Sequence, residues 1–149
     1  MALPTGARGS EQVRARHRIM IYSDLEVAWD IQSHITEWPS WQTDISDALL
    51  LEMLAPGATF TWTSFDTTAT SVVLDLVAGH CLRFGEVLGD GGGFHEWTFE
   101  PVGRGVLVTA AAIRVGEPVA LDREGVQAFL DEGLMFWLDQ LKAAAEARN

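Results

Sequence analysis

Residues 126–147, with the sequence VQAFLDEGLMFWLDQLKAAAEA, decide the fold of this chain. Apolar residues recur there at helical spacing and form one broad face, made of Val126, Phe129, Leu130, Gly133, Leu134, Trp137, Leu138 and Leu141. A helix with such a face is stable only when another layer of structure covers it. The pattern therefore predicts a long amphipathic helix, beginning after Pro118, that lies against a sheet.

The preceding segment, between residues 46 and 116, predicts that sheet. Its short alternating runs are bounded by glycine, proline and aspartate, which is typical of consecutive antiparallel strands. We expect six strands in this segment, at 46–53, 58–65, 69–78, 80–88, 94–100 and 106–115.

The N-terminal part predicts one more strand and two short helices. Residues 17–23 alternate and are rich in β-formers, and Ser23-Asp24 offers an N-cap for a helix over 25–35. A second short helix is expected within 36–44. The first sixteen residues have no apolar period and predict a flexible tail, so that residues 17–149 form a single domain. This order predicts an α+β fold, in which a curved seven-stranded antiparallel sheet wraps around the C-terminal helix and leaves a pocket along the helix flank.

Composition excludes several classes of protein. The 149 residues suit one domain, and 10 basic against 21 acidic side chains give a net charge of −11, which argues against nucleic-acid binding. No apolar run approaches the ~20 residues that span a bilayer. Cys81 is the single cysteine and cannot form an internal disulfide, and the N-terminus lacks the apolar core of a secretory signal, so we expect a cytoplasmic protein.

Strand pairing predicts which side chains face the helix, because opposed residues of an antiparallel pair point to the same face. A turn at residues 89–93 would place Glu86 opposite His95 and Phe84 opposite Trp97. All four side chains would then lie on the inner face.

The hairpin before it predicts further inner residues. A turn at residues 66–68 would place Phe60 opposite Leu74 and Trp62 opposite Val72. The other face of this hairpin is rich in threonine and suits solvent.

The last strand, 106–115, leaves its phase open. Val106 and Val108 lie on one face, Leu107 and Ile113 lie on the other, and the two faces are about equally apolar. Whether Thr109 lines the pocket is therefore undecided at the level of sequence.

Glu86 and His95 break the pattern of an otherwise apolar face, which makes them candidates for chemistry. A hydrogen bond between them would fix the imidazole tautomer and raise its basicity, giving an oriented general base. The alternative is that both lie solvated at the rim and only link two strands. The four histidines lack metal-ligand spacing, so we expect neither a metal nor another cofactor.

Five segments together resemble the START-like helix-grip (SRPBCC) superfamily, in particular its polyketide cyclase/dehydrase and lipid-transport branch. They are EVAWDI, ITEWPSWQTDI, FTWTSF, FHEWTFEPVGRG and GLMFWLDQLKAAAEA. The resemblance implies a helix-grip fold with a deep apolar cavity between sheet and helix. Members include aromatic polyketide cyclases, lipid carriers, hormone receptors and chaperone activators, so the resemblance implies no single function. It also transfers no catalytic residue, because the catalytic positions differ between branches.

We therefore hypothesise a polyketide cyclase/dehydratase-like enzyme of secondary metabolism, such as antibiotic biosynthesis, with Glu86 and His95 as its acid–base pair. The expected substrate-binding residues are Phe60, Trp62, Val72, Leu74, Phe84, Trp97, Phe129, Gly133 and Trp137. The alternative is a non-catalytic binding or transport protein for a small hydrophobic or lipid-like metabolite.

The expected partner is an apolar small molecule, rather than a nucleic acid or a membrane, and a homodimer is an open alternative. An acidic carrier protein would be repelled by the net charge of −11. The exception would be a local docking patch formed by Arg83, Arg114 and Arg123.

Overall fold

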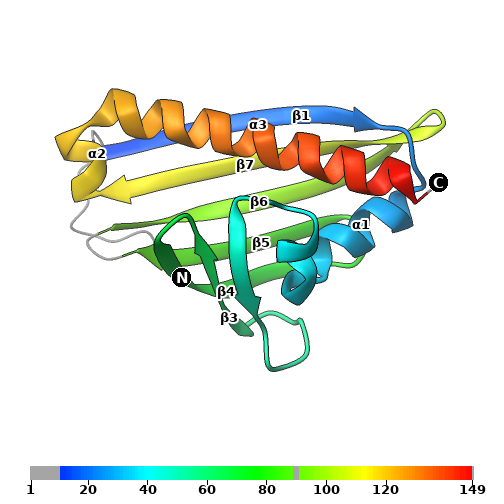
Figure 1. Cartoon of the computed structure of the whole chain (residues 1–149), viewed down its shortest axis with the longest axis horizontal. Coiled ribbons are helices and arrows are strands. Elements are labelled where there is room, and N and C mark those ends of the chain that lie inside the picture. The colour runs from blue at the N-terminus through cyan, green and yellow to red at the C-terminus, as the bar shows by residue number, and fades with distance from the viewer. Residues whose placement is uncertain (1–10, 89–90, 149) are drawn as a thin grey trace.

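The computed structural model describes residues 11–88 and 91–148. Along the chain the elements are β1 (Gln12–Ile21), α1 (Leu25–Ser33), the 3-10 helix η2 (Ile35–Ser40), β2 (Ile45–Leu49), β3 (Thr59–Ser64), β4 (Thr67–Val77), β5 (Cys81–Leu88), β6 (Gly91–Val102), β7 (Gly105–Gly116), α2 (Glu117–Leu121) and α3 (Arg123–Ala147). The strands form one seven-stranded sheet in the order β1-β7-β6-β5-β4-β3-β2, and every neighbouring pair is antiparallel. The long helix α3 runs across one face of this sheet (Figure 1). The predicted α+β architecture is confirmed.

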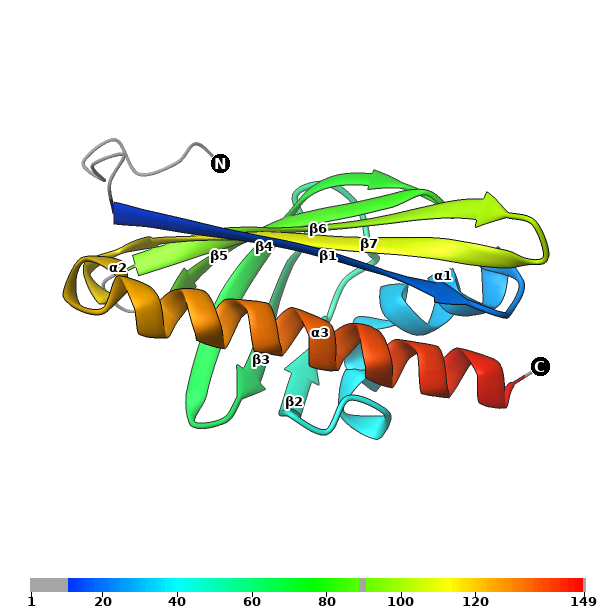
Figure 2. The same ribbon diagram turned by 90° about the horizontal axis from the view of Figure 1, so that it is seen from above.

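The sheet curves around α3. Seen from above, β2, β3 and β4 bend down beside the helix, while β1, β7 and β6 lie over it (Figure 2). Side chains of α3 also donate to the backbone of the terminal strand β1: Gln127 Nε2 lies 2.7 Å from the carbonyl oxygen of Arg14, and Lys142 Nζ lies 2.7 Å from that of Met20. These bonds hold the helix in place and occupy polar groups of an edge strand that could otherwise pair with another chain.

The first strand begins earlier than predicted, at Gln12 instead of residue 17. Val13 and Ala15 are buried, whereas Arg14 and Arg16 are exposed, so the alternation of a half-buried strand already starts here. Residues 12–16 were expected to be part of a tail, and this expectation was wrong. Residues 1–10 of the predicted tail lie outside the described residues.

The C-terminal helical region is divided in two. Pro118 lies in the first turn of the short helix α2, and Asp122 separates α2 from α3. The Asp122 carboxylate accepts a hydrogen bond from the backbone N–H of Gly125 at 3.0 Å, which is the arrangement of an N-cap. The cap sets the start of α3 and thus the register of its apolar face against the sheet.

The register of β3 and β4 differs from the prediction. Ser64 pairs with Thr67, so the turn consists of Phe65 and Asp66, and Phe65 adopts a left-handed backbone with φ 55°. Trp62 is consequently opposite Ala69.

Because this register is shifted by an odd number of residues, the inner and outer faces of β4 are exchanged there. Ser71 and Val73 are buried on the inner side, and the predicted inner residues Val72 and Leu74 lie on the opposite face. A bulge between Val73 and Asp75 then restores the predicted pairing of Leu76 with Leu82.

The register of β5 and β6 also differs, but by an even number of residues. Glu86 is opposite Gly93 instead of His95, and Phe84 is opposite His95. An even shift leaves each side chain on its predicted face, so Glu86 and His95 still point to the inner side, where both are buried.

β7 pairs with β1 and β6, and this pairing determines which of its side chains face inward. Val106, Val108, Ala110 and Ala112 are buried on the inner face. Thr109 lies in the alternate phase and does not line the cavity, whereas Arg114 continues the inner row.

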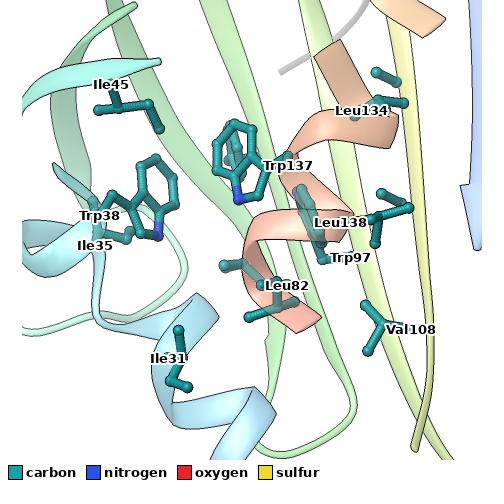
Figure 3. Close-up of a cluster of buried hydrophobic side chains, with 14 of the residues drawn as sticks. Ile31, Ile35, Trp38, Ile45, Leu82, Trp97, Val108, Leu134, Trp137 and Leu138 are labelled. Carbon is teal, nitrogen blue, oxygen red and sulfur yellow. The ribbon is translucent and has the colours of Figure 1, made fainter. Parts of the chain in front are cut away.

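An aromatic cluster fills the interior beneath the C-terminal half of α3, close to α1 and η2 (Figure 3). The fully buried Trp38 is its centre, with ring centroids 5.0 Å from Trp137 and 5.7 Å from both Phe60 and Trp62. Gln32 joins the two helices to this cluster, since its side-chain oxygen accepts from Trp137 Nε1 at 3.0 Å and its backbone oxygen accepts from Trp38 Nε1 at 2.9 Å. This half of the interior is packed with aromatic rings.

Candidate functional site

The other half of the interior is hollow. A cavity of about 920 Å³ lies between the N-terminal half of α3, the β3–β4 turn and the adjoining ends of β5, β6 and β7. Its walls include the apolar side chains of Trp62, Ala69, Val126, Leu130 and Leu134. A space of this size accommodates a drug-sized organic molecule.

Small residues create this space. A Cβ atom added at Gly133 would meet no other atom within 4 Å, so the absent side chain leaves open volume against the helix. Ala69 stands opposite Trp62 and contributes only a methyl group to the wall. The cavity therefore exists because α3 and β4 carry small side chains where the neighbouring cluster carries aromatic rings.

A buried acid–base group adjoins the cavity. Glu86 Oε1 lies 3.1 Å from His95 Nε2 and 2.9 Å from Arg114 Nη1. Glu86 is 2% exposed and His95 is 5% exposed, and all three residues line the cavity. The prediction of a Glu86–His95 contact is correct, and the alternative of a solvated rim pair is wrong.

The carboxyl group of Glu86 is held in its ionised form. Burial acts to raise its pKa, but the charge and hydrogen bond of His95 and those of Arg114 outweigh burial and lower the pKa below its ordinary value. Arg114 thus supplies the counter-charge that a buried carboxylate requires.

The imidazole of His95 is held firmly. It stacks on Phe84 with ring centroids 4.8 Å apart and planes at 10°, and the edge of Trp62 approaches it at 5.9 Å. Since Nε2 faces an ionised carboxylate, the geometry assigns the proton of the neutral ring to Nε2 and the lone pair to Nδ1. Within the described part of the chain, Nδ1 has no hydrogen-bond partner.

Two phenylalanines meet at the cavity mouth. Phe65 in the β3–β4 turn and Phe129 on α3 contact each other with ring centroids 5.6 Å apart, and each is 57% exposed. Both rings line the cavity, together with the acidic residues Asp44, Asp122 and Glu132. The mouth is therefore apolar across its middle and negatively charged around it.

The predicted site residues fall into three groups. Those that line the cavity are Glu86, His95, Trp62, Phe129, Gly133 and Trp137. Phe60, Phe84 and Trp97 are fully buried members of the aromatic cluster or its neighbours and do not line the cavity, contrary to prediction. Val72 and Leu74 lie on the outer face of the sheet, where Leu74 borders a small groove with Arg83 and Phe94.

Arg114 is the site residue that sequence reasoning missed. It was considered only as part of a docking patch with Arg83 and Arg123, and these three side chains have separate partners. Arg83 pairs with Glu96 at 3.2 Å, Arg123 donates to the Gln12 carbonyl, and Arg114 turns inward to Glu86. Alternate residues of a strand share one face, so Arg114 lies on the same side of β7 as Val108 and Ala110. Its role could have been predicted once these two residues were known to face inward.

Comparison with known proteins places this architecture among solved structures. The aromatase/cyclase ZhuI from Streptomyces sp. R1128 superposes with a TM-score of 0.81 at 12% identity, over 92% of this chain and 95% of that one. A START superfamily protein from Mycobacterium smegmatis superposes with a TM-score of 0.79 at 14% identity, over 91% and 99% of the two chains. The chain has a START-like helix-grip fold.

The same helix-grip fold occurs in the di-domain aromatase/cyclase StfQ of the steffimycin pathway, with a TM-score of 0.79 and 18% identity. This chain covers 52% of StfQ. No protein-family model matches the sequence, and no curated protein matches it either. At these identities the comparisons establish the helix-grip fold alone.

Two further findings concern the described residues. Within 11–88 and 91–148, no three His, Cys, Asp or Glu side chains are grouped so that they could hold a metal ion. None of the helices there has the length and apolar character needed to cross a membrane.

Proposed function

We propose that this protein binds an apolar polyketide-type intermediate in its cavity and promotes cyclisation or dehydration by general acid–base catalysis. The observation that carries the proposal is the buried His95, which lines the cavity, is oriented by Glu86, and has no hydrogen-bond partner for Nδ1 among the described residues. The helix-grip likeness to the aromatase/cyclases ZhuI and StfQ supports the same reaction class.

His95 acts first as a base. Its Nδ1 removes a proton from a carbon between two carbonyl groups, and the electron pair moves onto a carbonyl oxygen to form an enolate. Glu86 stabilises the resulting imidazolium through Nε2–H, and Arg114 keeps Glu86 ionised throughout.

His95 then returns the proton. The enolate carbon attacks a second carbonyl carbon of the same molecule, a carbon–carbon bond forms, and the new alkoxide takes the proton from Nδ1. In a subsequent dehydration His95 removes the adjacent C–H proton, a double bond forms, and the hydroxyl group leaves with that proton as water. Protons and electrons balance without a metal or redox partner.

The cavity walls contribute through shape. Trp62 and Trp137 line the cavity next to His95, with ring centroids 5.9 and 6.3 Å from the imidazole. Flat rings at this position favour an extended, conjugated chain folded close to its reactive geometry. Because a C–H between two ketones is already acidic, a modest base is sufficient.

A carrier or sensor of an apolar metabolite is the second candidate function. The size of the cavity and its apolar walls favour this function, since neither requires chemistry. The fold is also that of the START superfamily protein from Mycobacterium smegmatis, over 91% of this chain and 99% of that one, so the fold is not confined to aromatase/cyclases.

Variants of the acid–base pair distinguish the two functions. With synthetic poly-β-ketone thioesters as substrates and mass spectrometry of products, we expect His95→Ala and Glu86→Gln to lower turnover by about 10²- to 10⁴-fold. In His95→Ala, ligand affinity should stay within about tenfold of wild type, because the cavity walls bind the ground state and the transition state equally well. Thr109→Ala, on the face of β7 opposite the cavity, is the control and should behave like wild type.

Two results would contradict catalysis. Turnover that is unchanged in both variants would remove the acid–base role from Glu86 and His95. A parallel loss of binding and turnover would favour the carrier.

A further inference from the structure

Two buried acceptor atoms of residues that line the cavity have no hydrogen-bond partner among the described residues. Glu86 uses Oε1 for both His95 and Arg114, while its Oε2 has no partner among the residues that the structure describes. The same holds for His95 Nδ1. Both residues are more than nine-tenths buried and line the cavity.

The chemistry of these atoms defines what they bind. An ionised carboxylate oxygen can only accept hydrogen bonds, and Nδ1 is also an acceptor when Nε2 carries the proton. Buried acceptors are nearly always paired in proteins, because leaving one unpaired costs the desolvation free energy of that group. A group that satisfies these two acceptors must bring an O–H or N–H donor. Besides its ion pair with Glu86, Arg114 Nη1 is also buried without a hydrogen-bond partner among the described residues, and it can donate to an oxygen of the same group.

We propose that the inner end of the cavity selects an uncharged, flat ligand with a free hydroxyl group of phenol or enol type, whose O–H donates to Glu86 Oε2. This inference deepens the proposed function and rests on it, because it names the form of the intermediate that the same cavity binds. A fully ketonic or O-methylated molecule has no such donor. A carboxylate ligand has no donor for Glu86 Oε2.

Charges around the mouth act in the same direction. Asp44, Asp122 and Glu132 line the cavity, and the chain as a whole carries a net charge of −11. Negative potential along the entrance lowers the local concentration of anionic ligands. Neutral ligands are unaffected by this field.

Three naphthalene derivatives of similar shape test whether the cavity prefers a ligand with a free hydroxyl group. They are 2-naphthol, which has the donor; 2-methoxynaphthalene, which lacks it; and 2-naphthoate, which is an anion. Binding is measured by calorimetry at neutral pH on the full-length chain. We expect 2-naphthol to bind about tenfold or more tightly than the methyl ether, as a hydrogen bond to a charged group implies, and 2-naphthoate to bind most weakly.

Glu86→Gln tests most directly whether the Glu86 carboxylate accepts the hydrogen bond of the ligand. The amide oxygen of glutamine can take the position between His95 and Arg114, which turns the free position from an acceptor into an N–H donor. The preference for naphthol over its methyl ether should then fall to less than about threefold or reverse. Thr109→Ala, on the face of β7 opposite the cavity, should keep the wild-type preference.

Folding of the variants is checked by circular dichroism. If Glu86→Gln does not fold, the double variant Glu86→Gln/Arg114→Met serves instead, because it removes both charges of the pair. Equal affinity for naphthol and its methyl ether in wild type would overturn the inference, as would a preference that persists in the variant that folds. Failure of all three probes to bind would also overturn it.

The outcomes for this inference and for the proposed function are distinguishable. Selective binding of naphthol without any turnover of poly-β-ketones would leave the donor-selective site in place and refute the catalytic role. Turnover that depends on His95, together with equal binding of the naphthalene probes, would support the catalytic role and refute the donor-selective site.

Discussion

The two halves of the space between α3 and the sheet are built in opposite ways. Under the C-terminal half of the helix, Trp38 and Trp137 pack edge to face, with ring centroids 5.0 Å apart. Under the N-terminal half, Gly133 faces open volume and a cavity of about 920 Å³ remains. One curved sheet and one helix thus provide both a solid core and a binding space, and side-chain size alone separates them.

The comparison indicates how the fold tolerates a large cavity. Interior packing elsewhere is dense, and the loss of contacts around a cavity lowers stability. The aromatic cluster, with edge-to-face contacts among Trp38, Trp62 and Phe60, offsets this loss next to the cavity. Stability and binding are therefore assigned to separate parts of one interior.

The largest expected effect comes from the solid half. Trp38→Ala should lower the free energy of unfolding by about 3–5 kcal/mol, because it removes a fully buried indole from the centre of the cluster. Val126→Ala, its counterpart on the cavity wall, should cost about 1 kcal/mol or less, since its side chain is only partly buried. Urea denaturation measures both, and equal losses would show that the two halves do not differ in packing.

Replacing Glu86 should change the free energy of unfolding in a pH-dependent way. At pH 7, Glu86→Gln should lower stability by about 2 kcal/mol, because it leaves Arg114 without its counter-charge. The folded-state pKa of Glu86 lies below its ordinary value of 4.5, so the stabilisation is complete above that value and is lost as the pH falls below it.

Urea unfolding of wild type and Glu86→Gln between pH 7 and pH 3 tests this. The difference between the two proteins should shrink below pH 4.5. A difference that stays constant over this range would mean that the Glu86 pKa is not lowered in the folded state.

Filling the hollow half should affect binding more than stability. Gly133→Ala should raise stability by up to about 1 kcal/mol, because alanine favours the helix and its methyl group meets open space. Gly133→Leu should project into the cavity and weaken binding of 2-naphthol, with little effect on unfolding. Unchanged naphthol affinity in the leucine variant would place the ligand elsewhere.

The smallest effect is expected at the entrance. Phe129→Ala removes one of the two rings that meet across the mouth, and should speed association of 2-naphthol while changing its Kd by less than about threefold. Stopped-flow quenching of tryptophan fluorescence measures the rate. A large change in Kd would indicate that Phe129 is part of the binding wall itself.

Strand register decided which of the predicted site residues stayed on the inner face of the sheet. The shift between β5 and β6 was even, so Glu86 and His95 kept their predicted face. The shift between β3 and β4 was odd, so Val72 and Leu74 moved to the outer face. The two-residue turn responsible contains Phe65 with a positive φ, a conformation that glycine or asparagine adopts far more readily than phenylalanine.

Local periodicity in the sequence was sufficient to predict the α+β architecture, the long covering helix and the presence of two ionisable residues on an apolar face. Periodicity reports burial one element at a time, so it does not specify how the elements meet. Only the tertiary structure decided that Phe84 and Trp97 fill space while Trp62 lines it, and that Arg114 reaches Glu86. These outcomes depend on turns, a bulge and the relative volumes of side chains from distant strands, which act together only when the chain is folded.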